Sequence, residues 1–552
     1  MRQWRQNRRR EVTLNRPPFF SSAIRIASLI IFFNSSVYYS NAMVVKQLTP
    51  GITSNPSHCI MRRTCTQLSA QQTSSSQDET STSQTYWERL GSPKSVMAPM
   101  VSQSDLPFRH LCRNHGTDLC FTQMIHSHNF DQSQQFGDMH LDVYKPDSAL
   151  QITKSGRSAL EGLEWDDFYE RNPHISSLDE LVKNQWGTYR EGTRKNENDA
   201  LIVQLAGNDP TIISRVARNI LERTNASNGS MYDGPVSGID INCGCPQGIA
   251  RKGRYGAFLM EESVTTVCDL LSTLRKDLPS NVGVSAKIRI PESKVDLKDR
   301  IQRLVDTGAD LITVHGRTLK ENKTRVRQCD WDAIAYAVEV ARDHSGVSDF
   351  PIIANGGIEF PSDIQRCLSY TKASAVMSSE SLLENPGLFQ ISAEDETVVD
   401  PENIFLRQIG YCHEYLDLCV ISPPLPGSLG KEGGSFNCIR GHLFKILYRY
   451  LEEQPDLREM MGHSKQTTSI QHAREIINEL ERRYSEVMWT NIKSSNHEKS
   501  WYRRHRDSLS LIRIRGQKVS SDLNDLDLDQ KKKLLRERIR KLKESKAGGV
   551  TF

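Results

Sequence analysis

Short apolar runs alternate with longer amphipathic stretches between Pro93 and about Phe389. The apolar runs have the length of buried β-strands, and helix-length segments such as 209–223, 261–276, 297–306 and 361–370 lie between most of them. The expected strands are Ser95–Ala98, Leu119–Gln123, Leu201–Leu205, Gly238–Asn242, Gly283–Ile288, Leu311–His315, Ile352–Asn355 and Ala375–Met377. Because strand–helix alternation implies a parallel sheet, these eight units predict an α/β fold, the closed (β/α)8 TIM barrel.

The barrel pattern is interrupted once and followed by further segments. Residues 129–198 form an expected insertion after the second strand, and we expect its aromatic residues Trp165, Phe168, Tyr169 and Trp186 to pack a small subdomain onto the barrel. Beyond the barrel, 403–418, 436–457 and 471–483 have the pattern of amphipathic helices. The expected organisation is an extension at 1–88, a catalytic barrel at 89–395, a helical domain at 400–490 and a charged tail at 491–552.

The first residues have the composition of a targeting segment rather than of a folded domain. Five arginines lie within the first ten residues, ahead of a short apolar run at 27–33; Ser- and Thr-rich sequence follows, and Glu11 is the only acidic residue before Asp78. This composition fits an organelle transit peptide, in a plastid or mitochondrion, or a signal peptide; an extension without a targeting role, in a cytoplasmic protein, is the alternative. The run is shorter than the roughly 20 residues that span a bilayer, so no stable membrane association is expected.

Charge and cysteine content restrict the possible functions less than the sequence motifs do. The 71 basic and 67 acidic residues nearly cancel, so a nucleic-acid partner has to be recognised locally. The basic run at 531–543 is one candidate for contact with RNA and is equally well explained as a solvated helix. Twelve cysteines without a CxxC pair indicate neither a disulfide framework nor a metal site, and they leave a free thiol available for chemistry.

Polar residues stand at the carboxyl ends of the expected strands. They are Pro99, Met100, Gln204, Asn242, Lys287, His315 and Asn355. Each alone could be an ordinary strand cap, but in a (β/α)8 barrel this end carries the active site, so together they predict one convergent site.

Two segments of small residues follow the last two expected strands. Asn355-Gly356-Gly357-Ile358 and Ser378-Ser379-Glu380 lie where barrel enzymes bind phosphate, because small residues let backbone N–H groups approach phosphate oxygens. This position favours a phosphorylated cofactor such as FMN. No GxGxxG motif follows a strand, so a Rossmann-type dinucleotide site is not indicated.

The central motif is Asp-Ile-Asn-Cys-Gly-Cys-Pro-Gln at 240–247, continued by Gly-Ile-Ala-Arg-Lys-Gly at 248–253. Further matches are Met97–Val101, Ser104–Arg109, Thr313–Thr318, Val376–Glu380 and Arg440–Lys445. These motifs resemble the tRNA-dihydrouridine synthase family, and the 246–253 segment is similar to its eukaryotic branch acting at positions 16 and 17 of the tRNA D-loop. The resemblance implies FMN-dependent reduction of uridine to dihydrouridine, with NADPH or NADH as a transient electron donor and tRNA as partner.

The resemblance also assigns residues. Cys245 corresponds to the family's catalytic acid, since reduction of the uracil double bond requires a proton as well as a hydride; Cys243, two residues away, is distinguished from it by family position alone. Asn242 is expected to read the uracil edge, and Arg289 and Arg317 to hold flavin phosphate or RNA backbone, with ordinary salt bridges as the alternative. The residues matching flavin-binding positions are Pro99, Met100, Gln204, Lys287, His315, Asn355, Gly357, Ser379 and Glu380. Lys287 and His315 are expected to act as cationic donors near flavin N1.

Two further expectations concern substrate and class. Residues Arg440, His442, Phe444, Lys445, Tyr448 and Arg449 could contact phosphates or stack on bases, or form an ordinary helix. Ser381, where the family commonly has glycine, could crowd the phosphate loop. The alternatives to a dihydrouridine synthase of this position specificity are another position, a dihydroorotate-dehydrogenase-like enzyme and a non-catalytic RNA-binding relative; we expect a monomer without a metal.

Overall fold

Eight parallel strands close into a barrel in the computed structural model, which describes residues 84–141, 160–173, 175, 200–226, 236–322, 325–390, 401–421, 424, 436–463, 467–486 and 500–502. The barrel strands are β1 (Ser95–Met97), β2 (Leu119–Phe121), β4 (Leu201–Ala206), β5 (Val236–Cys243), β6 (Gly283–Arg289), β7 (Leu311–His315), β8 (Ile352–Asn355) and β9 (Ala375–Ser378). The pairings β1–β9 and β2–β4 close the ring, and a short strand, β3 (Ile125–His126), pairs in parallel with the carboxyl end of β4. The predicted TIM barrel is confirmed, with all eight strands where they were expected.

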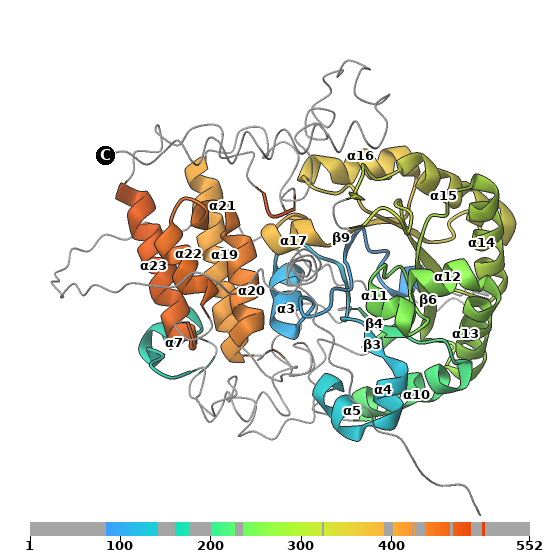
Figure 1. The fold of residues 1–552 in the computed structure, drawn as a ribbon, viewed down its shortest axis with the longest axis horizontal. Helices are drawn as coiled ribbons and strands as arrows, with labels where there is room; N and C mark the ends of the chain where they lie inside the picture. The colour runs from blue at the N-terminus through green and yellow to red at the C-terminus, as the bar shows by residue number, and fades with distance from the viewer. Residues whose placement is uncertain are drawn as a thin grey trace, which may run out of the picture.

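Helices surround the barrel (Figure 1). They are α3 (Leu106–Asn114), α10 (Pro210–Ala226), α11 (Gly248–Lys252), α12 (Ala257–Glu262), α13 (Val264–Asp277), α14 (Lys294–Asp306), α15 (Trp331–Ser345), α16 (Pro361–Thr371) and α17 (Glu380–Glu384). Strand residues alternate between two apolar layers. Met97, Val203 and Val314 belong to the cluster shared with the helices, whereas Val96, Ile202 and Ile353 belong to the cluster inside the barrel. Burial on both faces is why these strands are continuous apolar runs in the sequence.

A short helix before the first strand, α2 (Tyr86–Arg89), contributes to the cluster inside the barrel through Tyr86 and Trp87. The Tyr86 hydroxyl donates to the Ser237 carbonyl at 3.2 Å. A Cβ atom placed on Gly283 would lie 2.0 Å from the Tyr86 ring, and one on Gly238 would lie 2.5 Å from its hydroxyl. Residues assigned to the N-terminal extension by sequence therefore pack as part of the barrel.

The C-terminal helical domain consists of α19 (Pro401–Ile421), α20 (Phe436–Ile446), α21 (Tyr448–Leu451), α22 (Pro455–Gly462) and α23 (Ile470–Glu486). The expected helices at 403–418 and 471–483 are confirmed. The single helix expected at 436–457 is wrong, because the chain divides there into α20, α21 and the start of α22, where Pro455 occupies the first turn. Proline lacks the N–H that an uninterrupted helix would need at that point.

The insertion divides between the two domains. Helices α4 (Ser127–Gln132) and α5 (Gln134–Leu141) lie against α10 of the barrel, and Arg215 pairs with Asp131 at 2.6 Å. The third helix, α7 (Trp165–Arg171), lies beside α23 instead (Figure 1), and Arg171 pairs with Asp417 of α19 at 3.1 Å. The expectation that the aromatic residues pack onto the barrel is wrong for α7, although Phe168 is fully buried as a core residue; Trp186 lies outside the described residues.

Among the described residues, no helix is both long and apolar enough to cross a membrane. The first 83 residues and the basic run at 531–543 lie outside the part of the chain that the structure describes.

Candidate active site

The carboxyl ends of β4 to β8 bring the expected polar residues together. A buried chain of hydrogen bonds begins at Asp240 of β5, whose carboxylate accepts from Gln204 Nε2 at 2.8 Å and from Ser285 Oγ at 2.7 Å. Asn242 Nδ2 then donates to Gln204 Oε1 at 2.8 Å. Sequence analysis missed Asp240 as a site residue, because its importance depends on neighbours from β4 and β6.

Asn242 shapes the loop that carries the catalytic candidate. Its Oδ1 accepts from the backbone N–H of Gly244 at 3.2 Å and of Cys245 at 3.0 Å. Its Nδ2 donates to Gln204 and also faces Met124 Sδ at 3.2 Å. Both ends of this amide are therefore engaged within the protein, and reading a uracil edge would require one of these bonds to be released.

The two cysteines of the motif differ in position. Cys243 is fully buried in the layer between strands and helices, whereas Cys245 is partly exposed and packs near Tyr255 and Ala250. Burial raises the pKa of the Cys245 thiol, against smaller opposing effects of the Gln247 backbone and the cations Arg289 and Lys287. The structure thus separates the two on geometry: Cys245 is the accessible thiol, and it is protonated at neutral pH.

Lys287 and His315, the two residues expected to be cationic at this end of the barrel, differ in charge. Lys287 Nζ donates to Asn355 Oδ1 at 2.7 Å, and burial, with help from Arg289, lowers its pKa to about 8, so it is charged at neutral pH. Burial and the neighbouring cations Arg289, Lys287 and Arg317 lower the pKa of His315 well below its ordinary value. The expectation of a cationic His315 is therefore not supported. Since Arg317 Nη1 donates to His315 Nε2 at 3.1 Å, the ring proton lies on Nδ1.

Arg289 and Arg317 bind backbone carbonyls. Arg289 joins the loop after β5 to the loop after β7, donating from Nε to the Gly244 carbonyl at 2.8 Å and from Nη1 to the Thr318 carbonyl at 2.9 Å. Arg317 is 7% exposed and donates from Nε to the Arg327 carbonyl at 2.8 Å. Arg289 therefore braces one loop against another, whereas the Arg317–Arg327 contact lies within the segment between β7 and α15.

The glycine segment after β8 requires glycine for both backbone and space. Gly356 and Gly357 have φ values of 101° and 78°, and a Cβ on Gly357 would lie 2.9 Å from Trp331 Nε1. Ser379 and Glu380 lie at the start of α17 next to this segment in the fold, and the Ser381 hydroxyl donates to the Ile358 carbonyl at 2.7 Å. Ser381 is thus bonded into the segment rather than left free to crowd it.

The residues present fit FMN. A phosphate approaching the 355–358 segment meets backbone that carries no side chains at two successive positions. Lys287 and the Nδ1–H of His315 are donors of the kind that suit the carbonyl and nitrogen atoms of a flavin ring, whereas the amides of Gln204 and Asn355 are already hydrogen-bonded within the protein. Pro99 and Met100 follow β1 on the same side of the barrel and are half-buried. In the described residues the expected cofactor side chains are therefore gathered at one end of the barrel.

A segment near the C-terminus, which the sequence did not reveal, lies beside this site. Ser500 Oγ donates to Glu384 Oε2 at 2.6 Å, and the Tyr502 side chain hydrogen-bonds Arg317. Trp501 packs on Tyr448, with ring centroids 5.5 Å apart, and under Lys445 at 5.4 Å.

For two of the α20 residues, the structure favours the alternative of an ordinary helix residue over contact with RNA. Arg440 is 8% exposed and donates to the Thr467 carbonyl at 3.4 Å, and His442 is fully buried. Phe444, Lys445 and Tyr448 are partly exposed, as expected of residues that could meet a substrate.

Comparisons with known proteins agree with this geometry. The family model described as dihydrouridine synthase (Dus) matches residues 96–160 and 176–495. The tRNA-dihydrouridine(16/17) synthase [NAD(P)(+)] of Saccharomyces cerevisiae is 30% identical over 69% of this chain and 71% of its own, and that of Schizosaccharomyces pombe is 29% identical over 68% and 75%. The tRNA-dihydrouridine(20a/20b) synthase [NAD(P)+] of S. cerevisiae is 28% identical over 54% and 62%. The closed barrel, the Cys245 loop and these matches together show that the chain belongs to the dihydrouridine synthase (Dus) family.

Proposed function

We propose that this protein reduces uridine to 5,6-dihydrouridine in the D-loop of tRNA, at positions 16 and 17, with FMN as bound cofactor, NADPH or NADH as electron donor and Cys245 as proton donor. The observation that carries the proposal is the partly exposed, protonated Cys245 thiol beside a donor set suited to a flavin. Relatives named tRNA-dihydrouridine(16/17) synthase match over about 70% of the chain, which favours tRNA and these positions.

The chemistry divides between cofactor and protein. When bound, reduced FMN would provide the hydride for uracil C6, and the protein has to supply one proton to C5 to complete the single bond. Cys245 holds that proton on Sγ because burial disfavours its thiolate. Once the proton has left, the thiolate lies near the positive charges of Arg289 and Lys287, which lower its energy until a solvent proton replaces the lost one.

The remaining residues orient the reactants. Asn242 fixes the backbone of the Cys245 loop, so the position of the proton donor depends on the Gln204–Asp240 chain behind it. Lys287 offers a positive charge that would complement the negative charge of a reduced flavin, and His315 offers a neutral Nδ1–H as a hydrogen-bond donor. The glycines at 356 and 357, with Ser379 and Glu380, would hold the phosphate.

The test is position-resolved mapping of dihydrouridine by mass spectrometry. FMN-loaded protein and NADPH are incubated with native tRNA that lacks dihydrouridine, using the wild type, Cys245→Ala and the matched control Cys243→Ala. We expect product at positions 16 and 17, a rate lower by about 10²–10⁴ in Cys245→Ala with flavin and tRNA binding retained, and near-normal rate in Cys243→Ala.

Other outcomes discriminate between the alternatives. Product at another position would refute the position assignment and implicate the insertion. Equal loss in both cysteine variants would refute Cys245 as proton donor. No product despite bound flavin and bound tRNA would refute the reaction and favour a non-catalytic RNA-binding relative.

A further inference from the structure

The loop between β1 and α3, residues 98–105, carries Pro99 and Met100, and its shape is fixed by its own hydrogen bonds. Ser104 Oγ donates to the Ala98 carbonyl at 3.0 Å and accepts from the Met100 N–H at 2.8 Å. Arg109 Nη1 donates to the Ser104 carbonyl at 2.7 Å. The position of Met100 is therefore tied to that of Ser104 and its neighbour Asp105.

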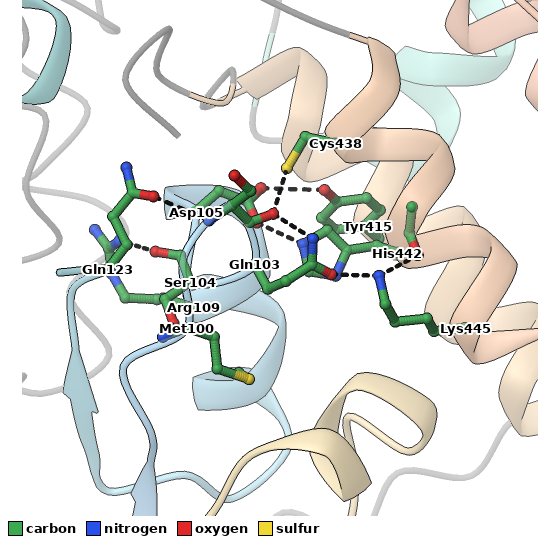
Figure 2. Close-up of polar contacts among 12 residues, drawn as sticks. Met100, Gln103, Ser104, Asp105, Arg109, Gln123, Tyr415, Cys438, His442 and Lys445 are labelled. Carbon is green, nitrogen blue, oxygen red and sulfur yellow. Dashed lines mark hydrogen bonds and ion pairs between the residues drawn. The ribbon is translucent and has the colours of Figure 1, made fainter. Parts of the chain in front are cut away.

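Helix α20 of the helical domain reaches this loop from the other side (Figure 2). Cys438 Sγ donates to the Ser102 carbonyl at 3.4 Å, His442 Nε2 donates to Asp105 Oδ1 at 2.6 Å, and Lys445 Nζ donates to the Gln103 side chain. The three α20 residues are spaced four and three apart, so they share one face of the helix. One face of a C-terminal helix thus bonds three residues, 102, 103 and 105, of a loop more than 330 positions earlier.

The central contact is fully enclosed. Asp105 and His442 are 1% and 0% exposed, Tyr415 donates to Asp105 Oδ2 at 3.1 Å, and the His442 ring stacks on Phe108 with centroids 4.1 Å apart. Burial lowers the pKa of His442, against the opposing effect of Asp105. With its proton on Nε2, the neutral His442 imidazole donates a hydrogen bond to Asp105. If the imidazole were removed, Asp105 would be a buried acceptor without this donor, and that loss costs far more free energy of folding than the loss of a hydrogen bond at the surface.

The same side chains have the composition of a metal site, since ligand atoms of Asp105, Cys438 and His442 lie within 4.8 Å of one another. Their contacts favour hydrogen bonding. His442 Nε2 points its donor at Asp105, burial raises the pKa of Cys438 well above its usual range, and Cys438 donates to a backbone carbonyl. A metal held by Cys438 and by Nε2 of His442 would require a thiolate and an unprotonated Nε2, the opposite state of both groups.

We propose that α20 positions the flavin-binding loop, and that the Asp105–His442 hydrogen bond is the latch that holds it. The inference rests on the proposed function in one respect, that Pro99 and Met100 meet the flavin. Asp105 and His442 are positioning residues, and the helical domain forms part of the cofactor site as well as a surface for RNA. Removing the Asp105–His442 hydrogen bond makes the loop at 98–105 more mobile and weakens FMN binding, while the conformation of the Cys245 loop stays the same.

The first experiment measures hydrogen exchange of residues 98–105 in the flavin-free full chain. We expect His442→Leu to speed exchange there about tenfold or more, and His442→Gln, whose amide nitrogen can reach Asp105, to restore most of the protection. The matched control is Asp417→Asn, which breaks a buried pair with Arg474 inside the helical domain and lies outside the latch. The same speeding in Asp417→Asn, or none in His442→Leu, would overturn the latch.

The second experiment measures the FMN dissociation constant by quenching of flavin fluorescence. We expect an increase of about tenfold in His442→Leu, little change in His442→Gln and none in Asp417→Asn. Should His442→Leu fail to fold, Asp105→Leu/His442→Leu removes both partners without stranding a buried charge, and the same increase is expected. Unchanged affinity in a folded latch variant would overturn the proposal.

The two readouts separate the two proposals. Absence of FMN binding by the wild type would refute the proposed function, while the exchange of residues 98–105 would still decide whether α20 holds the loop. Zinc bound stoichiometrically to the purified wild type and lost in His442→Leu would overturn the hydrogen-bonded latch in favour of a metal site.

Discussion

Replacing Asp240 by asparagine tests the electrostatics of the site most directly. The Asp240 carboxyl group is fully buried, and burial raises its pKa from 3.8 to about 6, despite hydrogen bonds from Gln204 and Ser285 and the charge of Lys287. In Asp240→Asn, Oδ1 can accept from Gln204 Nε2 and Nδ2 can donate to Ser285 Oγ, so the shape of the network is preserved.

The size of the effect follows from the pKa difference. A shift of about 2 units corresponds to about 3 kcal/mol between the two protonation states. Because the folded-state pKa is the higher one, the folded protein holds this proton more tightly, so ionisation of Asp240 costs stability as pH rises from about 4 to about 6, and the full cost applies above about 6. Asparagine does not ionise and avoids that cost.

The assay is denaturant unfolding of wild type and variant across pH. The free energy of unfolding of the variant minus that of the wild type should rise by about 2 kcal/mol between about pH 4.5 and about pH 7.5, since groups common to both proteins cancel. A difference that stays flat, or falls, would show that hydrogen bonds and Lys287 outweigh burial, and would refute the reasoning.

Three further predictions concern the cofactor site and the C-terminal segment. Lys287 has a pKa of about 8 and is charged below it, so FMN affinity should fall as pH rises through about 8 or somewhat above, and Lys287→Met should abolish this dependence in a fluorescence titration. Gly357→Ala places a Cβ 2.9 Å from Trp331 Nε1 at a φ of 78°, so FMN affinity measured the same way should drop by about tenfold or more, and unchanged affinity would contradict the role of this segment. Glu384→Ala removes the acceptor of the Ser500 hydroxyl, so chymotrypsin should cleave near residues 501–502 about tenfold faster, and an unchanged rate would show that other contacts hold the segment.

Much of the barrel could be predicted because its signals are local. Each strand is buried on both faces and therefore reads as an apolar run, and each amphipathic helix carries its own periodicity. The division of 436–457 into three helices was less accessible, although Pro455 marks the start of α22. The placement of α7 on the helical domain depends on the Arg171–Asp417 pair, which joins residues 246 positions apart.

The candidate site shows the same division. Residues at strand ends could be named from the sequence because parallel strands bring their carboxyl ends together. The protonation and hydrogen-bonding states of these residues could not be predicted from the sequence. His315 is neutral because it is buried beside three cations, and the Asn242 amide is engaged because it bonds Gln204 and Met124. The burial of His442 was missed because an apolar helix face does not reveal that its partner is Asp105.

Tyr86 has a consequence for how related sequences vary. Gly238 and Gly283 have no left-handed backbone, so glycine is required there by space, chiefly the space that the Tyr86 side chain fills; at Gly238 the Gly283 carbonyl oxygen, at 3.1 Å, adds a smaller restriction. Residue 86 and the two strand positions should therefore change together among relatives: an aromatic residue at 86 accompanies glycine at both, whereas a small residue at 86 permits alanine or serine in the strands. Evolutionary covariation across about 150 to 200 positions would then record how the amino end of the barrel is filled.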